Sequence, residues 1–365
     1  MTVTHRNQNI ISTQRDAWVE INLDRLERNY KKIKDLVRTN IMAVVKADAY
    51  GHGATTIAPI LENLGVHSFG VATVNEGVAL RKAKIKSPIL ILGATPLWAI
   101  DTCLENNLMV SIYSKTQLSK IIELNPEKLS CHLKIDTGMN RLGVDPSDAL
   151  DVVKQISAQK NLNLLGVFSH LSDAENEEFS VVQKNRFGKA IQEIKTLNLN
   201  LAYHLSNSFG SVKYADFRYD LVRVGIALFG QEYDFLEPLM SVKGRITEVH
   251  KVKKGEFVSY ERTWEAKEDS LIATIPIGYA DGIDRKLSNK ITASLKGCDI
   301  KQVGNITMDQ MMFDISHVPD VKENDVITLV DDSHSIAAWA KELNTITYEL
   351  VCRLKLRMPR VYVRD

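Results

Sequence analysis

The chain has 365 residues, of which 44% are hydrophobic and 25% charged, as in a soluble globular protein long enough for two domains. Its 46 basic and 45 acidic residues give a net charge of +1, which excludes a general electrostatic attraction to nucleic acid or to anionic membranes. Nucleic acid and membranes are therefore not expected as partners.

The spacing of the four cysteines matches no metal-ligand pattern, so no metal site is predicted. They are Cys103, Cys131, Cys298 and Cys352, and we interpret them as free thiols in a reducing compartment. The first ten residues are polar and lack the apolar core of a signal peptide. The apolar stretch 87–100 is too short to span a bilayer. These features predict a cytoplasmic protein.

The first two-thirds of the chain alternates between amphipathic helices and short apolar runs. Apolar residues at helical spacing predict helices over 26–37 and 57–64, the second closed by Gly65. The predicted strands are 41–45, 68–72, 89–92, 108–112, 132–135, 164–168, 202–205 and 224–228. Eight strand–helix units over ~250 residues favour a closed (β/α)8 TIM barrel, and an open doubly wound parallel sheet is the alternative.

The pattern changes near Met240, where strand-like segments are separated by turns rather than by long helices. These segments are 242–252, 256–260, 271–276, 291–295 and 326–330, and a helix at 336–343 precedes a last strand at 361–363. We therefore predict an α/β protein with an N-terminal barrel at 1–245 and a mainly-β C-terminal domain at 246–365. The first ~15 residues are candidates for pairing with the second domain.

Lys46 stands where the buried strand 41–45 ends and a glycine-flanked polar loop begins. Lysine is rarely buried without a partner, so its position needs an explanation. One explanation is chemical, because partial desolvation lowers the pKa of an amine and allows it to form a Schiff base. A purely structural lysine is the alternative that this position alone leaves open.

Further polar residues gather at the predicted ends of strands, which in a barrel form the active-site face. They are Tyr50, Lys134, Asp136, Arg141, His170, His204, Asn207, Ser208 and Arg223. Each alone has a simpler interpretation: Ser208 can be a helix N-cap, and a histidine at a strand end is commonly only hydrogen-bonded. Together they suit pyridoxal phosphate, which needs a Schiff-base lysine, a phosphate cradle and partners for its ring nitrogen and phenolic oxygen.

Several segments, taken together, carry a resemblance to a known family. They are Ala-Val-Val-Lys-Ala-Asp-Ala-Tyr-Gly-His-Gly at 43–53, then 134–143, 204–210 and 223–230, and in the second domain 258–260, 275–282, 308–310 and 357–360. The chain resembles the alanine racemases, fold-type III pyridoxal phosphate enzymes, over nearly its whole length. The lysine segment and the Gly-Tyr-Ala-Asp-Gly segment at 278–282 make the resemblance specific.

The resemblance implies a role for each matching residue. Lys46 would hold the cofactor and act as one catalytic base, and Tyr260 of the other subunit would be the second. The other cofactor contacts would come from Tyr50, Arg141, His170, Asn207, Ser208, Arg223, Gly225 and Ile226. Arg223 would face the pyridine nitrogen, and Arg141 would lie near the phenolic oxygen. Lys134, a lysine that family members can carry as a carbamate, would orient Arg141.

The resemblance also implies where the substrate lies and what the protein does. Arg141, Tyr279 and the partner's Met308 and Asp309 would surround a small amino-acid substrate. The implied activity is the interconversion of L-alanine and D-alanine by two bases in a cytoplasmic homodimer with a composite active site. D-alanine from this reaction would supply peptidoglycan. A decarboxylase on the same scaffold is disfavoured by Arg223, and a non-catalytic cofactor carrier by the full second domain.

Three positions depart from the family pattern near the implied substrate pocket. Leu356 stands where many members have a tyrosine that reaches the phosphate, Glu261 where glycine is common, and Thr307 where cysteine is common. These residues leave open an alternative function, a racemase of broader or shifted specificity that acts on serine or on other small amino acids.

Overall fold

The structure is a computed structural model that describes residues 3–5 and 15–365. Its chain divides into two compact units. The barrel unit comprises residues 27–49 and 53–228. The second, which we call the β unit, comprises 50–52, 229–365 and the described residues up to 26.

The barrel unit is built on parallel strands that form two ladders, ordered β10-β3-β4-β5 and β6-β7-β8-β9. The strands are β3 (Asn40–Val44), β4 (Ser68–Val71), β5 (Ile89–Ile91), β6 (Val110–Ile112), β7 (Leu129–Lys134), β8 (Leu162–Phe168), β9 (Ala202–His204) and β10 (Leu221–Val224). Met109 joins the ladders on one side, because its N–H donates to the carbonyl of Ile89 and its carbonyl accepts from Ile91, both at 2.9 Å. On the other side, Asp220 N–H donates to the Tyr203 carbonyl at 3.1 Å. The barrel is therefore closed, which excludes the open sheet.

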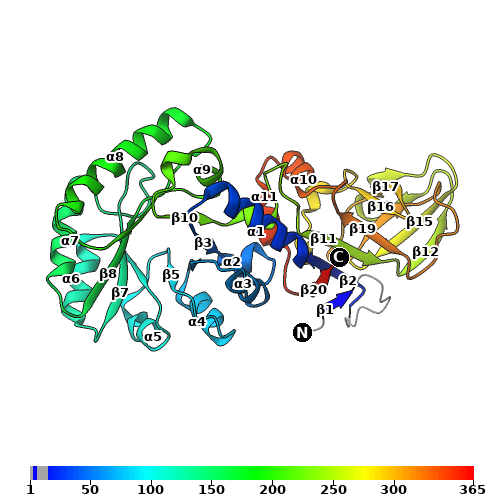
Figure 1. The fold of residues 1–365 in the computed structure, drawn as a ribbon. Helices are drawn as coiled ribbons and strands as arrows, with labels where there is room; N and C mark the ends of the chain where they lie inside the picture. Colours follow the sequence, from blue (N-terminus) through cyan, green and yellow to red (C-terminus); the bar gives the residue numbers. More distant parts are fainter. Residues whose placement is uncertain (1–2, 6–14) are drawn as a thin grey trace. The chain divides into compact units, whose positions relative to one another are not determined.

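Helices follow most of these strands and surround the barrel (Figure 1). They are α1 (Leu23–Val37), α3 (Ala54–Asn63), α4 (Val74–Lys82), α5 (Ile100–Glu105), α6 (Lys115–Leu124), α7 (Ala149–Ser157), α8 (Glu177–Lys195) and α9 (Ser208–Lys213). Inside the barrel, Met42, Leu90, Met109, Phe168 and Leu221 form an apolar cluster from different strands. None of the helices in the described part of the chain has both the length and the apolarity needed to cross a membrane.

The last barrel strand differs from its prediction. The strand expected at 224–228 lies at Leu221–Val224, and Ile226–Phe229 forms a 3-10 turn instead. The apolar run from 221 to 229 is nearly continuous, so its pattern alone could not show where the strand ends. Arg223 therefore lies inside β10, with its side chain in the barrel, rather than at the start of a strand.

The β unit contains a sheet of ten strands, ordered β1-β20-β2-β11-β19-β16-β17-β18-β15-β12. Its strands are β1 (Val3–His5), β2 (Ala17–Asn22), β11 (Met240–Arg245), β12 (Glu248–Val252), β15 (Ser270–Ile275), β16 (Thr292–Leu295), β17 (Cys298–Val303), β18 (Met311–Asp314), β19 (Val326–Val330) and β20 (Arg360–Arg364). A separate hairpin pairs β13 (Phe257–Val258) with β14 (Trp264–Glu265). The helices α10 (Ile336–Leu343) and α11 (Thr347–Arg353) complete the unit.

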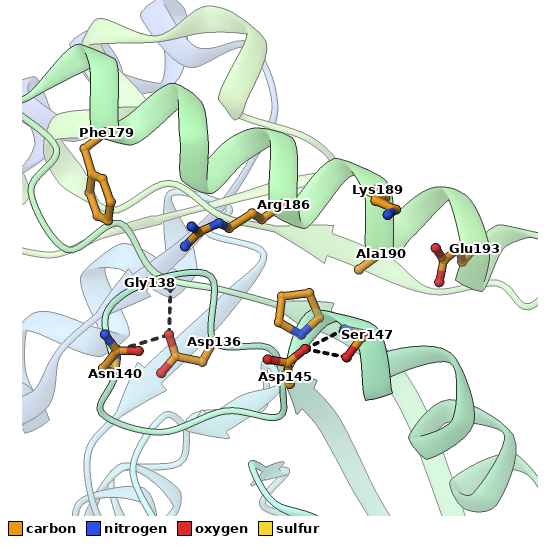
Figure 2. Close-up of a pocket in the computed structure, with 11 residues that line it drawn as sticks. Asp136, Gly138, Asn140, Asp145, Ser147, Phe179, Arg186, Lys189, Ala190 and Glu193 are labelled. Carbon is orange, nitrogen blue, oxygen red and sulfur yellow. Dashed lines mark hydrogen bonds between the residues drawn. The ribbon is translucent and has the colours of Figure 1, made fainter.

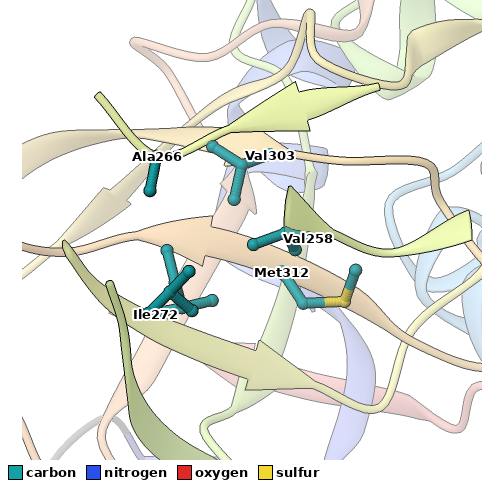
Figure 3. Packing of buried hydrophobic residues seen from close by; sticks show 6 residues of the cluster. Val258, Ala266, Ile272, Val303 and Met312 are labelled. Atoms are coloured by element: carbon teal, nitrogen blue, oxygen red, sulfur yellow. The ribbon is translucent and has the colours of Figure 1, made fainter. Parts of the chain in front are cut away.

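One hydrophobic cluster of the β unit joins the hairpin to the large sheet. Figure 3 shows Val258 and Ala266 facing Ile272, Val303 and Met312. All five are at most 8% exposed. This packing fixes the base of the hairpin, and Tyr260 lies two residues beyond its first strand.

Two predictions for the β unit need correction. The single strand expected at 242–252 is two strands, β11 and β12. β11 pairs with β2 and β19 in the large sheet, and the domain boundary at 245 stays a prediction. Tyr260, expected in a strand, begins a 3-10 turn at Tyr260–Arg262. Of the first ~15 residues, Val3–His5 pair with β20, and residues 6–14 lie outside the described part.

Candidate active site

Lys46 begins a turn with an unusual backbone. Ala47, Asp48 and Ala49 all lie in the left-handed helical region, with φ between 52° and 54°. Each such residue costs about 1–2 kcal/mol when it is not glycine. Tertiary contacts hold the turn: Glu76 of α4 accepts from Ala47 N–H at 2.7 Å, and Asp48 accepts from the N–H at 54, also at 2.7 Å. Strain of this kind gathers at functional sites, and here it directly follows Lys46.

Arg223 lies buried in the barrel, 3% exposed, and is surrounded by acceptors. Its guanidinium donates to Nδ1 of His204 at 2.9 Å and to Nδ1 of His170 at 3.1 Å. It also donates to the carbonyls of Ser169 at 2.6 Å and Leu205 at 2.9 Å. Because a guanidinium can only donate, both Nδ1 atoms must accept, and each neutral ring then carries its proton on Nε2.

The electrostatics of His170 show that the predicted cations converge. Burial lowers the pKa of His170 well below its ordinary value, and the charges of Arg223, Lys134, Arg141 and Lys46 lower it further, in that order of effect. These four residues come from different strand ends and loops of the barrel unit. The structure thus brings the predicted lysines and arginines to one face of the barrel around a neutral histidine.

Lys134 and Arg223 have altered acid–base properties. Burial, followed by the charges of Arg223 and Arg141, lowers the pKa of Lys134 from 10.5 to about 7. The Lys134 ammonium also lies 5.1 Å from the ring centroid of Phe168. Burial lowers the pKa of Arg223 to about 9, so the guanidinium remains charged at neutral pH. Lys134 is therefore a partly neutral, nucleophilic amine whose pKa two neighbouring cations lower.

The loop that carries Arg141 is organised by Asp136. This carboxylate accepts the backbone N–H groups of Gly138, Met139, Asn140 and Arg141 at 2.9–3.1 Å. Burial acts to raise the pKa of Asp136, but the four donors together lower it. The result is a tightly closed turn that fixes the backbone at Arg141.

A cavity of about 790 Å³ lies beside this loop. Figure 2 shows α8 along one side, with Phe179 and Arg186 facing the loop that bears Asp136 and Asn140. The Arg186 guanidinium donates to the Thr137 carbonyl at 3.1 Å, which links the helix to the loop. Lys46, Lys134 and Arg223 do not line this cavity, so it is not the place where the predicted site residues meet.

The predicted phosphate segments lie against each other. Gly225 N–H donates to the Ser208 hydroxyl oxygen at 2.9 Å, and Ser208 is 6% exposed. The N-cap of α9 is Asn207, whose side chain accepts from Gly210 N–H at 3.0 Å. The capping role considered for Ser208 is thus filled by Asn207. Polar groups therefore gather where β9 and β10 end: the hydroxyl proton of Ser208 and the backbone of Gly225 and Ile226.

The predicted site residues of the β unit lie on loops that hydrogen bonds connect. Tyr279 N–H donates to the Thr307 carbonyl at 3.0 Å, and the Asn305 side chain donates to the Tyr260 carbonyl at 2.9 Å. Arg357 contacts Asp309 at 2.7 Å and the fully buried Asp281 at 3.1 Å. The large apolar and aromatic side chains exposed on these loops include Tyr260 (70%), Leu356 (77%), Met308 (54%) and Tyr279 (40%).

Tyr50 belongs to the β unit although it closely follows Lys46 in sequence. Its ring lies 5.4 Å from that of Phe229 and 6.3 Å from that of Tyr348. Its predicted contact with a phosphate stays a prediction.

Three residues that shape the site were given no role of their own from the sequence, and of these only Asp136 stood among the polar residues at predicted strand ends. Glu76 holds the turn after Lys46, Asp136 closes the Arg141 loop, and His132 contacts His204. Asp136 had a detectable signal, because an aspartate directly after a strand with glycine two residues later is typical of a side-chain-closed turn. Glu76 and His132 act through contacts distant in sequence, which spacing does not reveal.

Comparison with known proteins matches both units. The family model described as alanine racemase, N-terminal domain, matches residues 21–233, and the one described as alanine racemase, C-terminal domain, matches 239–362. The alanine racemase of Nostoc sp. is 40% identical, with 95% of this chain and 96% of that protein covered. The chain belongs to the alanine racemase family.

Other relatives agree with this membership. The alanine racemase of Clostridium novyi is 38% identical, with 96% of each chain covered. Among solved structures, the alanine racemase of Clostridium difficile 630 matches with a TM-score of 0.92 and 34% identity, covering 98% of this chain and 97% of that one. The predicted fold class, with a barrel followed by a mainly-β domain, is confirmed, and the chain is an enzyme of the racemase class.

Proposed function

We propose that this alanine racemase interconverts L-alanine and D-alanine with pyridoxal phosphate and two bases, Lys46 and Tyr260 of the partner subunit. In this proposal it is a cytoplasmic homodimer that supplies D-alanine for peptidoglycan. The observation that carries the proposal is the convergence of Lys46, on its left-handed turn, with the buried Arg223 and the neutral His170 on one face of the barrel. A solved relative from Bacillus anthracis, 30% identical, is described as having L-Ala-P bound, and one from Clostridium difficile as a complex with cycloserine.

The donors of the barrel unit fit the cofactor. The two terminal nitrogens of the Arg223 guanidinium donate to acceptors within the described part of the chain, whereas its Nε–H has no hydrogen-bond partner there. A pyridine nitrogen is a suitable acceptor for this Nε–H. Ser208 accepts from Gly225 and retains its own hydroxyl proton for a phosphate oxygen. When bound, pyridoxal phosphate supplies the electron sink that acidifies the α-proton of an attached amino acid.

Arg223 limits how far that acidification goes. Its pKa of about 9 keeps it protonated at neutral pH, so it would donate to the ring nitrogen of a bound cofactor without transferring a proton to it. A weaker electron sink favours return of the proton to the same carbon over side reactions such as transamination. Arg223 is therefore expected to suppress side reactions such as transamination as well as to support the rate of racemisation.

Racemisation removes a proton from one face of Cα and returns one to the other, which suits two bases on opposite faces. Lys46 serves one face. Tyr260 is 70% exposed in the single chain, as expected of a side chain that completes a site on a second subunit.

The proposal is tested with the purified protein. We expect it to bind pyridoxal phosphate with the absorbance of a lysine-bound cofactor and to convert L-alanine to a racemic mixture. A protein without cofactor absorbance after incubation with pyridoxal phosphate would contradict the cofactor assignment. Binding without racemisation of any small amino acid would contradict the reaction.

A second candidate function, a racemase that prefers serine or other small amino acids, is favoured by Leu356. This side chain is 77% exposed on the loop next to Arg357, and it has no hydroxyl group to offer to a phosphate or a substrate. We expect kcat/KM for L-alanine to exceed that for L-serine, and Leu356→Tyr to increase the ratio. A parent kcat/KM for serine equal to or above that for alanine would replace the alanine assignment.

Carbamylation of Lys134 is expected to depend on pH. Only the neutral amine reacts with CO₂, giving a carbamate and releasing one proton, and the pKa of about 7 makes this form abundant from pH 7 upwards. The anion would lie close to Arg141 and Arg223, whose charges favour it. With ¹³C-labelled bicarbonate, a carbamate signal should grow between pH 6 and 8 and be absent in Lys134→Met. A signal that persists in the variant would assign the carbamate elsewhere.

The unmodified lysine should also affect folding. Because its pKa is lower in the folded protein, the unfolded chain binds more protons between about pH 7 and 10.5. Without CO₂, this residue therefore makes the free energy of unfolding rise with pH across that window. Lys134→Met should remove the contribution, measured by urea unfolding at several pH values.

A further inference from the structure

His132 lies deep in the barrel, 4% exposed, next to His204, which is fully buried. Nδ1 of His132 and Nε2 of His204 are 3.0 Å apart. Because Arg223 donates to Nδ1 of His204, the single proton of that neutral ring lies on Nε2. His204 must then donate to His132, so the hydrogen bonds run in one direction from Arg223 through His204 to His132.

The backbone around His132 is built to hold its ring. The pairing of β7 with β8 shifts register between Cys131 and His132, so that Cys131 faces Leu164 and His132 faces Gly166. A Cβ atom at residue 166 would lie 2.5 Å from Nδ1 of His132, closer than atoms can pack. The irregularity redirects the side chain, and Gly166 provides the space that the ring occupies.

His204 is fixed on its other side as well. Its ring stacks on that of Phe168, with centroids 4.9 Å apart and planes 2° from parallel. The ring therefore has a set plane, and its two nitrogens contact Arg223 and His132. Which nitrogen carries the proton decides whether both contacts are hydrogen bonds.

We propose that His132 is a positioning residue that fixes the tautomer of His204 and, through it, the guanidinium of Arg223. The inference rests on the proposed role of Arg223 toward the cofactor ring. Without an acceptor at residue 132, the Nε2–H of His204 is buried without a partner. The other tautomer places Nδ1–H against the N–H of Arg223, donor against donor. Either outcome weakens the hold on Arg223.

His132 is suited to this role because it remains a neutral acceptor. Burial, followed by the charges of Arg223 and His67, lowers the pKa of His132 to about 3. Its Nδ1 lone pair is therefore available across the neutral range. The hydrogen bond from His204 to His132 is therefore expected to persist throughout the neutral pH range.

A matched pair of variants separates the hydrogen bond from the packing. His132→Asn places an oxygen near the former Nδ1 position and so keeps a hydrogen-bond acceptor. His132→Leu keeps a side chain of similar volume but removes the acceptor. Cys131→Ala, at the buried residue next to His132 in β7, serves as the control for lost stability. We measure thermal unfolding, the absorbance of bound pyridoxal phosphate, kcat and KM, and the tautomer of His204 by NMR of ¹⁵N-histidine in the protein without added cofactor.

We expect His132→Leu to fold, to lose the single Nε2–H form of His204, to shift the cofactor absorbance and to lower kcat about tenfold with little change in KM. His132→Asn should stay within about threefold of the parent, and Cys131→Ala should keep kcat whatever its stability. A folded His132→Leu with the parent's tautomer and kcat overturns the proposal, as does an equal loss in the leucine and asparagine variants. Failure of the parent to bind the cofactor would count against the proposed function, and the tautomer measurement would still decide the role of His132.

Discussion

Lys46→Ala is expected to abolish racemisation, with kcat lower by at least about 10⁴-fold, because one change removes both the base on one face of Cα and the attachment point of the cofactor. The variant should still fold, since Lys46 precedes the left-handed turn, and the contacts that hold this turn come from Glu76 and Asp48. Three measurements check this: the rate of L-alanine racemisation, the absorbance of bound cofactor and the thermal unfolding midpoint.

The matched control for this variant is Lys82→Ala, which removes an exposed lysine in the last turn of α4. It should leave kcat and cofactor absorbance unchanged. If Lys46→Ala kept the absorbance of a lysine-bound cofactor, another amine would be the attachment point. Lys134, with its pKa of about 7, would then be the first to test.

The sequence was sufficient to place the strands that carry the site, but not every strand end. Predicted and observed limits agree within three residues for seven barrel strands, because each is a short apolar run bounded by polar residues. β10 was placed three residues too late because apolar residues continue through Ile226–Phe229. β2 is absent from the predicted strands, although all six of its residues are buried and it pairs with β11 and β20.

The places of the candidate site residues at strand ends could be predicted individually, but the contacts between them could not. Lys46 and Arg141 follow strands in a pattern that local sequence shows. The left-handed turn at Ala47–Ala49 has no such signal, because it contains no glycine and is stabilised by residues elsewhere in the fold. The hydrogen bonds from Arg223 through His204 to His132 join three separate strands, so only the closed barrel reveals them.

Tyr260→Phe is expected to lower kcat/KM by about 10²–10⁴-fold while leaving cofactor absorbance unchanged, because only the base on the second face is lost. L-alanine and D-alanine have equal free energies, so kcat/KM must fall equally in both directions. In D₂O, however, Lys46 remains able to exchange the α-proton of one enantiomer without inverting it. Exchange confined to one enantiomer, followed by NMR, would identify Tyr260 as the opposing base.

Tyr219→Phe, which removes a hydroxyl group from a ring that packs against Phe187 two residues before β10, is the matched control for Tyr260→Phe and should retain full activity. A fully active Tyr260→Phe would refute the two-base assignment. The assignment would also be refuted if Tyr260→Phe exchanged the α-protons of both enantiomers with D₂O at the parent's rate.

The same two variants test whether the active site is shared between subunits. A Lys46→Ala chain retains Tyr260, and a Tyr260→Phe chain retains Lys46, so a mixed dimer holds one site with both groups intact and one with neither. After equal amounts are dissociated and reassembled, half of the dimers are mixed, and about a quarter of the parent activity should return. If each site used the Lys46 and Tyr260 of one chain, the mixture would stay inactive. Recovery of activity from two inactive chains therefore separates a composite site from two independent ones.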